Sequence, residues 1–201
     1  QIGATVVEVL VEGGGMAERT EIRLAGSADQ NLALAGVILA EAAAIYDYKY
    51  ATQSQSYGPE ARSGASKTDV IISAEMIENP RAMNVNFLLA LTDDACRRYV
   101  DELSEGGTLL LDSDLVKEVP PERPIRVYRL PLLRLARDKA GRESLLSIVA
   151  LGAIAALAEV VSYDALEQAV LARIPKGMEE ETRRALHVGR EEAQRAVEKK
   201  P

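Results

Sequence analysis

The chain has 201 residues, of which 47% are hydrophobic and 27% charged, and its net charge is −7. This composition is typical of one globular domain with a sizeable core, and it excludes a disordered or fibrous chain. Because the chain is acidic and has no basic block, we expect no nucleic-acid partner and no binding to an anionic membrane.

Metal and disulfide chemistry is restricted, because the chain has one cysteine, Cys96, and one histidine, His187. One cysteine cannot form an internal disulfide, an iron–sulfur cluster or a closed zinc site. We therefore expect no metal site, a buried Cys96 and a surface His187. The longest apolar stretch, Leu145–Ala158, is shorter than the roughly 20 residues of a bilayer span, which predicts a cytoplasmic protein without a membrane partner.

The first residues differ from the rest, because a run of three glycines, Gly13–Gly15, precedes Met16. We predict that residues 1–15 are an extension or linker, with a stray strand within Ile2–Val11. Residues 16–201 are then a single domain.

From Glu21 onward, apolar runs alternate with helical patterns. This alternation predicts an α/β fold with a mostly parallel sheet and helices on both faces. The first predicted helices are Leu32–Ile45 and Asp93–Leu103, the second with Thr92 as its N-cap and Gly106-Gly107 at its end. The predicted strands are Glu21–Ala25, Tyr48–Ser54, Thr68–Ser73, Val85–Leu91, Thr108–Leu111 and Ile125–Leu130.

The last third of the chain is predicted to be helical. Leu145–Val161 is apolar on nearly all sides, which predicts a buried helix. Ser162 is the expected N-cap of a helix over Tyr163–Arg173. The final helix, Glu179–Lys199, has a thin apolar stripe, which predicts light packing on the domain or on a partner chain.

A long polar connection, Thr52–Lys67, lies between two predicted strands and reads TQSQSYGPEARSGASK. Irregular connections of this length are usually functional or disordered. Its hydroxyl, amide and guanidinium groups suit a polar or anionic ligand. The alternative is a solvated loop without a ligand.

The turn Leu24–Asn31 follows a predicted strand and opens a predicted helix. In α/β domains such turns lie at the carboxyl edge of the sheet, where helix N-terminal amides can hold an anion. Only Gly26 of the expected glycines is present, and Asp29 would repel a phosphate. A simple tight turn is therefore favoured over a dinucleotide site.

The stretch Thr52–Arg62, with the following Gly64-Ala65-Ser66, closely resembles the signature loop of the gamma subunit of 2-oxoacid:ferredoxin oxidoreductases. The resemblance covers about Glu21 to Gly189. It is supported by Asp69–Ser73, Leu88–Leu91, Gly106–Leu109, Asp112–Leu115 and Val149–Ala153.

This resemblance implies a Rossmann-like, gamma-type subunit of an enzyme of the pyruvate, 2-oxoglutarate or ketoisovalerate type. Such enzymes oxidatively decarboxylate a 2-oxoacid with coenzyme A to an acyl-CoA and CO₂, and electrons pass to ferredoxin. The family implies thiamine diphosphate with Mg²⁺ in the alpha and beta subunits, and [4Fe–4S] clusters in the beta or a delta subunit. This chain alone is expected to bind no cofactor and to hold no catalytic residue.

The resemblance also implies candidate binding residues, because the signature loop is expected to face the entrance where coenzyme A approaches. Arg62 is the candidate for anion contact, such as a coenzyme A phosphate, and Glu60 orients it. The wall of this cleft is expected to include Ser54, Gln55, Ser56 and Tyr57. The family's glycine-rich turn is replaced here by Gly26-Ser27-Ala28-Asp29-Gln30-Asn31, which adds Gly26, Ser27 and Gln30 to the candidates.

Two other functions stay open at this point. A structural or assembly subunit without catalytic contacts would fit the altered glycine turn. A free-standing nucleotide-binding domain is disfavoured, because most of the glycines and a distinct basic pocket are missing.

Overall fold

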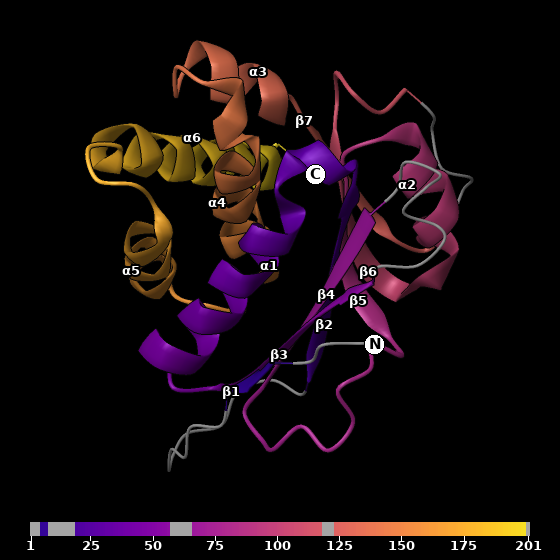
Figure 1. Cartoon of the computed structure of the whole chain (residues 1–201). Helices are drawn as coiled ribbons and strands as arrows, with labels where there is room; N and C mark the ends of the chain where they lie inside the picture. The colour runs from indigo at the N-terminus through magenta and orange to yellow at the C-terminus, as the bar shows by residue number, and fades with distance from the viewer. Residues whose placement is uncertain (1–4, 8–18, 57–65, 118–122, 200–201) are drawn as a thin grey trace.

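The computed structural model describes residues 5–7, 19–56, 66–117 and 123–199. In this part of the chain, one mixed sheet has the strand order β1-β3-β4-β2-β5-β6-β7, with helices on both faces (Figure 1). The strands are β1 Thr5–Val7, β2 Thr20–Gly26, β3 Tyr50–Ser56, β4 Ser66–Ser73, β5 Val85–Ala90, β6 Leu103–Asp112 and β7 Arg126–Leu130.

Two α-helices of the described residues lie between strands, and four follow the last strand, β7. The α-helices are α1 Leu32–Glu41, α2 Asp93–Tyr99, α3 Leu132–Asp138, α4 Leu146–Ala158, α5 Tyr163–Arg173 and α6 Glu179–Glu198. Shorter turns of helix are η1 Ala28–Gln30, η2 Ala42–Tyr46, η4 Val100–Glu102 and η5 Glu143–Leu145. The predicted α/β, Rossmann-like class with a helical C-terminal third is confirmed.

The sheet has a parallel half and an antiparallel half. Strands β2, β5, β6 and β7 are parallel neighbours, as the alternation of strands and helices predicts. Strands β1, β3, β4 and β2 pair antiparallel, which the sequence analysis missed. For β3 and β4 the reason is length: β3 ends at Ser56 and β4 begins at Ser66, so the connection is shorter than the dozen or more residues that a parallel crossover needs.

The predicted polar connection is shorter than expected, because its ends belong to this antiparallel pair. Thr52–Ser56 lie in β3, and Ser66-Lys67 lie in β4, with Ser56 opposite Lys67. Side chains alternate between the faces of a strand, so every second residue here has a fixed orientation. The candidate residues Ser54, Gln55 and Ser56 are therefore held by a sheet rather than by a loop.

The β1 strand lies within the predicted stray strand Ile2–Val11. Its backbone at Thr5–Val7 pairs antiparallel with Ala51–Gln53 of β3, at the edge of the sheet. The division into residues 1–15 and a domain over 16–201 stays a prediction, because most of the first segment lies outside the described residues.

Side-chain alternation gives the sheet two buried faces. Leu24, Phe87 and Leu110 point to one face, where they pack with α1 and α4 in the large core. Ala25 and Leu88 point to the other face, where they pack with α2 and Cys96. Cys96 is buried and His187 is exposed, as expected.

Two predicted helices end differently from the sequence prediction. Helix α2 begins at the Thr92 cap, whose Oγ1 accepts a hydrogen bond from the Ala95 amide at 3.1 Å, but it ends at Tyr99. Gly106-Gly107 do not close it, since they lie within β6, which already begins at Leu103. The predicted helix Leu32–Ile45 changes at Ala42 into the wider turn η2.

The stretch Ala28–Tyr46 is long and apolar enough to cross a membrane by length and composition alone. In this fold it is the α1 segment, and its residues Leu32, Ala35, Ile38 and Leu39 are buried in the large core. Core helices of globular domains have the same composition.

Helix α6 packs closely, which corrects the prediction of a light contact. It lies on α4, with Gly152 of α4 facing Leu186 and Gly189 of α6 facing Val149. A Cβ atom on Gly152 would lie 2.0 Å from the Leu186 carbonyl oxygen, and one on Gly189 would lie 1.9 Å from the Val149 carbonyl oxygen. The two glycines thus let the helix backbones touch, so a thin apolar stripe is sufficient for tight packing.

The N-cap of α5 is confirmed, because the Ser162 Oγ accepts from the Ala165 amide at 3.1 Å.

Candidate functional site

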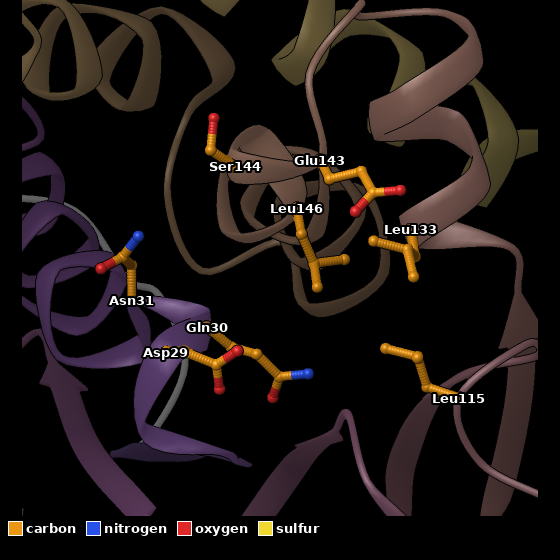
Figure 2. Close-up of a pocket in the computed structure, with 8 residues that line it drawn as sticks. All are labelled: Asp29, Gln30, Asn31, Leu115, Leu133, Glu143, Ser144 and Leu146. Atoms are coloured by element: carbon orange, nitrogen blue, oxygen red, sulfur yellow. The ribbon is translucent and has the colours of Figure 1, made fainter.

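Two hollows lie at or beside the described candidate residues, on different parts of the sheet. The first, of about 320 Å³, lies at the carboxyl ends of β2 and β6, beside the Gly26 turn (Figure 2). It is lined by Asp29, Gln30, Asn31, Leu115, Leu133, Glu143, Ser144 and Leu146. We call it the carboxyl-edge hollow.

The side chain of Gln30 occupies the backbone donor of the Gly26 turn beside this hollow. The Ser27 amide donates to Gln30 Oε1 at 2.8 Å, and Gln30 Nε2 donates to the Leu91 carbonyl oxygen at 3.4 Å. A Cβ atom on Gly26 would lie 2.1 Å from Gln30 Oε1, so the glutamine lies directly over the glycine. The amide that a bound phosphate would need is therefore already used.

The charges at the carboxyl-edge hollow are also unfavourable for a phosphate. The pKa of Asp29 is lowered, mainly by a hydrogen bond with the Ser27 side chain, so its carboxylate is charged at neutral pH. Glu143 contributes a second carboxylate to the lining. This hollow therefore repels anions, as the sequence predicts from Asp29 alone.

The far wall of this hollow is held by a buried carboxylate, Asp112, at the end of β6. Its Oδ1 accepts from the amides of Asp114 and Leu115 at 2.7 and 2.9 Å, and its Oδ2 accepts from the Leu133 amide at 2.7 Å. Asp112 is fully buried, and these three bonds satisfy it. Its role is to fix the turn after β6 and the start of α3.

The second hollow, of about 430 Å³, lies on the α2 side of the sheet, where β3 and β4 meet β2. It is lined by Arg23, Ser54, Gln55, Ser56, Lys67, Asp69, Pro80, Arg81, Ala82 and Glu102. We call it the cationic hollow, because three of these residues are Lys or Arg and two are acidic.

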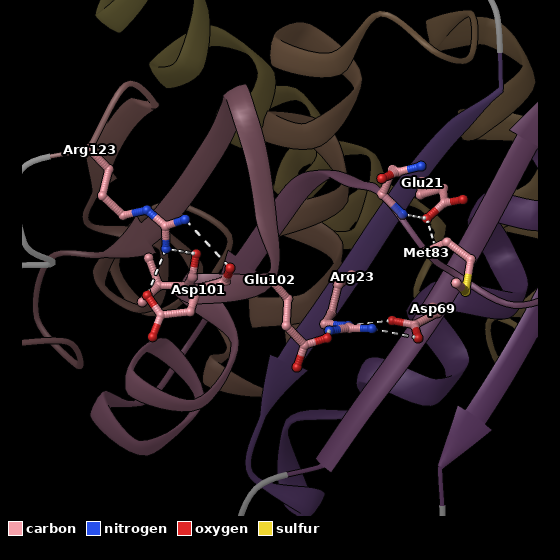
Figure 3. A network of polar contacts seen from close by, with 9 residues as sticks. Glu21, Arg23, Asp69, Met83, Asp101, Glu102 and Arg123 are labelled. Atoms are coloured by element: carbon pink, nitrogen blue, oxygen red, sulfur yellow. Dashed lines mark hydrogen bonds and ion pairs between the residues drawn. The ribbon is translucent and has the colours of Figure 1, made fainter.

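Both carboxylates of the cationic hollow bind Arg23 (Figure 3). Arg23 donates through Nε and Nη2 to the two oxygens of Asp69, at 2.6 and 3.0 Å, and through Nη1 to Glu102. Burial lowers the pKa of Arg23, but the hydrogen bonds and charges of Asp69 and Glu102 outweigh burial, and the net pKa is raised. The positive charge of Arg23 is thus compensated by two carboxylates of the same chain.

The other two cations of this hollow have no such partner. The Lys67 ammonium lies 5.3 Å from the centre of the Tyr99 ring, and the Arg23 guanidinium lies 5.2 Å from the same ring. Within residues 19–56, 66–117 and 123–199, no ion pair joins Lys67 or Arg81 to a carboxylate. These two cations leave the hollow with a positive character, which suits an anionic ligand.

The segment that carries Arg81 is fixed onto the sheet by a buried carboxylate, Glu21. One Glu21 oxygen accepts from the amides of Met83 and Asn84, each at 2.6 Å, and the other accepts from Arg19 Nε at 2.7 Å. Arg19 in turn donates to the carbonyl oxygens of Asn79 and Arg81, each at 2.6 Å. The wall of the cationic hollow is therefore rigid on this side.

The candidate residues divide between these two hollows. Ser54, Gln55 and Ser56 line the cationic hollow, whereas Gly26, Ser27 and Gln30 form the turn at the carboxyl-edge hollow. Tyr57, Glu60 and Arg62 lie outside the described residues.

Sequence reasoning missed Lys67 and Arg81. Lys67 lies at the end of the predicted polar connection Thr52–Lys67, but it was not among the predicted binding residues. Arg81 gives no local signal, because its segment is placed by hydrogen bonds with Glu21 and Arg19, which lie far from it in the sequence.

Among the described residues, no group of three or more His, Cys, Asp and Glu side chains could hold a metal ion. The fold and these two hollows define an α/β domain that presents a polar, cationic cleft without a metal centre or catalytic cluster in the described part.

The chain belongs to the pyruvate ferredoxin/flavodoxin oxidoreductase family, which matches residues 21–192. It is 44% identical over 176 residues to the 2-oxoglutarate synthase subunit KorC of Methanocaldococcus jannaschii, covering 87% of this chain and 94% of that relative. It is 42% identical over 178 residues to the KorC subunit of Methanothermobacter marburgensis, covering 86% and 96%.

Solved structures agree with this assignment. The gamma subunit of a keto/oxoacid ferredoxin oxidoreductase from Geobacter sulfurreducens superposes with a TM-score of 0.83 and is 48% identical, over 90% of this chain and 99% of that one. A 2-oxoglutarate:ferredoxin oxidoreductase from Magnetococcus marinus, solved with 2-oxoglutarate, coenzyme A and succinyl-CoA bound, shares the fold with a TM-score of 0.77 at 18% identity. This chain covers 32% of that protein.

The chain is thus a gamma-type subunit of a 2-oxoacid:ferredoxin oxidoreductase, and it works within a multi-subunit enzyme. The resemblance to this family is confirmed. The free-standing nucleotide-binding domain and the purely structural subunit are not supported.

Proposed function

We propose that this chain is the gamma subunit of an enzyme that converts 2-oxoglutarate and coenzyme A to succinyl-CoA and CO₂. Two electrons leave the substrate carbon in this reaction and are accepted by ferredoxin. The observation that carries the choice of 2-oxoacid is the 44% identity to a 2-oxoglutarate synthase subunit over nearly the whole of that subunit. The alpha and beta subunits, with a delta subunit where the clusters are separate, are proposed to hold thiamine diphosphate, Mg²⁺ and [4Fe–4S] clusters.

We propose further that the cationic hollow binds a phosphate of coenzyme A. Lys67 and Arg81 supply positive charge that no carboxylate within the described residues neutralises, and Ser54, Gln55 and Ser56 supply polar groups. The carboxyl-edge hollow is a poorer candidate, since Asp29 is charged and the Ser27 amide is already used. We also propose that Arg62 of the signature loop contacts an anionic group of coenzyme A, that Glu60 orients it, and that Tyr57 contributes to the wall of the coenzyme A entrance.

The substrate assignment is tested with the whole complex, purified from its source by native pull-down of this chain and identified by mass spectrometry. Ferredoxin reduction is then measured with 2-oxoglutarate, pyruvate and 2-oxoisovalerate, each with and without coenzyme A. We expect 2-oxoglutarate to have the highest kcat/KM and turnover to require coenzyme A. A preference for pyruvate or 2-oxoisovalerate would refute the substrate choice and leave the subunit assignment intact.

The role of Arg62 has its own test in the same complex. Arg62→Ala is expected to raise the KM for coenzyme A while the KM for 2-oxoglutarate stays unchanged, because a phosphate contact is lost. An unchanged KM for coenzyme A would show that Arg62 does not contact this co-substrate.

A further inference from the structure

The two carboxylates that bind Arg23 in the cationic hollow differ in exposure and in the number of their contacts (Figure 3). The Asp69 side chain is 12% exposed, and both of its oxygens accept hydrogen bonds from Arg23, at 2.6 and 3.0 Å. The Glu102 side chain is 51% exposed and accepts from Nη1 alone. Separating a buried ion pair costs far more than separating an exposed one, because an exposed carboxylate is taken up by water. Glu102 is therefore the partner that Arg23 can exchange.

The backbone around Glu102 is fixed by Arg123, whereas the Glu102 side chain is not. Arg123 donates to the Val100 carbonyl oxygen at 2.9 Å and to the Asp101 carboxylate at 2.7 Å. In the described part of the chain, Arg23 is the one hydrogen-bond and ion-pair partner of the Glu102 carboxylate. A rotation of this side chain alone thus frees Nη1, and neither η4 nor the sheet has to move.

Such a rotation changes the charge of the cationic hollow. Its charged lining residues are the cations Arg23, Lys67 and Arg81 and the carboxylates Asp69 and Glu102, so the lining has one net positive charge. When Glu102 turns into the solvent, two net positive charges remain. A phosphate monoester carries a charge of about −1.5 to −2 at neutral pH. The hollow therefore matches the charge of such a group after Glu102 has left, and not before.

We propose that Glu102 competes with the phosphate ligand of the cationic hollow for Arg23. A phosphate group that enters displaces the Glu102 carboxylate and accepts the hydrogen bond from Nη1 in its place, while Asp69 keeps Nε and Nη2. Glu102 thereby sets the affinity of the site, and Arg23 becomes its third cation when the ligand is bound. This inference rests on the proposed function, in which the ligand is a phosphate of coenzyme A.

The test is a titration of the full chain with inorganic phosphate, followed by NMR, for the wild type, Glu102→Gln, Glu102→Asp and the exposed control Glu105→Gln. We expect Glu102→Gln to bind phosphate about fivefold more tightly, because an exposed carboxylate no longer competes for Arg23. Glu102→Asp keeps the charge but shortens the side chain, so its gain is expected to be smaller. Glu105→Gln should bind phosphate as the wild type does. A gain in affinity is a result that damage to the fold does not produce.

Three results would overturn the proposal. The first is phosphate binding by Glu102→Gln that is unchanged, weaker or undetectable. The second is wild-type affinity in Glu102→Asp together with a gain in Glu102→Gln, which would make the charge of Glu102 and not its contact with Arg23 responsible. The third is a fall of several degrees in the Tm of Glu102→Gln together with weaker binding, which would make Glu102 a structural support.

Kinetics of the assembled enzyme separate this inference from the proposed function. Glu102→Gln is expected to lower the KM for coenzyme A about fivefold, as it tightens phosphate binding. Tighter phosphate binding with an unchanged KM for coenzyme A would leave the competition intact and refute the hollow as the coenzyme A site. A higher KM in Lys67→Met and Arg81→Met, with no effect of Glu102→Gln on phosphate binding or on this KM, would leave the site intact and refute the competition.

Discussion

Single residues decide the sign of the charge in each hollow. Arg23 has two carboxylates around it, so it adds no free positive charge to the cationic hollow, although it is the most buried cation there. Lys67 packs on the Tyr99 ring and keeps its charge for the hollow. The difference between the two cations lies in their partners and not in their residue type.

At Lys67 and Arg81, we predict that removing either charge weakens the binding of coenzyme A. In the assembled enzyme, Lys67→Met and Arg81→Met should each raise the KM for coenzyme A by roughly tenfold, which is the size of one charge-assisted contact. Steady-state kinetics at saturating 2-oxoglutarate measure this, with Lys176→Met as the exposed control. A rise in the KM for 2-oxoglutarate instead would assign the hollow to that substrate.

At Arg23, we predict a loss of stability. Arg23→Met leaves Asp69 charged and mostly buried without its partner, which should lower the free energy of unfolding by about 3–5 kcal/mol. Urea denaturation of the isolated chain measures this. A matched change at an exposed ion pair, Arg134→Met beside Asp114, should cost at most about 1 kcal/mol. Equal effects of both substitutions would refute the argument that burial makes Arg23 important.

At the scale of elements, the contact of α4 with α6 explains how a weakly apolar terminal helix becomes part of the core. Gly152 and Gly189 remove the Cβ atoms that would hold the helices apart, so backbone packs on backbone. Thr182, Ala185 and Leu186 are buried in the same helix. The helix is therefore an integral part of the domain and not a loosely attached arm.

From this contact we predict that Gly189→Ala is destabilising, although alanine favours helix formation. The added Cβ atom would lie 1.9 Å from the Val149 carbonyl oxygen, so α6 must move away from α4. We expect a loss of about 1–3 kcal/mol, seen as a lower Tm of the isolated chain. Gln194→Ala, on the exposed side of α6, is the control and should leave the Tm unchanged or slightly higher. A stable Gly189→Ala would show that the helices have room to adjust.

At the scale of the whole molecule, the described residues form the cationic hollow on the α2 side of the sheet and the acidic carboxyl-edge hollow. We propose that other chains supply the redox and decarboxylation chemistry. We predict that the isolated chain has no 2-oxoglutarate-dependent activity and that activity returns when the other subunits are added. Ferredoxin reduction before and after mixing measures this. Turnover by the isolated chain would contradict the division of labour.

The sequence alone determined the class of the fold and the family. Apolar runs such as Val70–Ile72 and the N-caps Thr92 and Ser162 act over a few residues, so their patterns are readable locally. The signature around Thr52–Arg62 was specific enough to identify the gamma subunit, and Asp29 was enough to make a phosphate at the Gly26 turn unfavourable.

Only the tertiary structure decided the rest. The antiparallel pairing of β3 with β4, the closure of the Gly26 turn by Gln30 and the position of Arg81 all depend on contacts between residues far apart in the sequence or on side-chain placement. Such contacts form when burial and hydrogen bonding of the whole chain are satisfied together, so no local pattern encodes them.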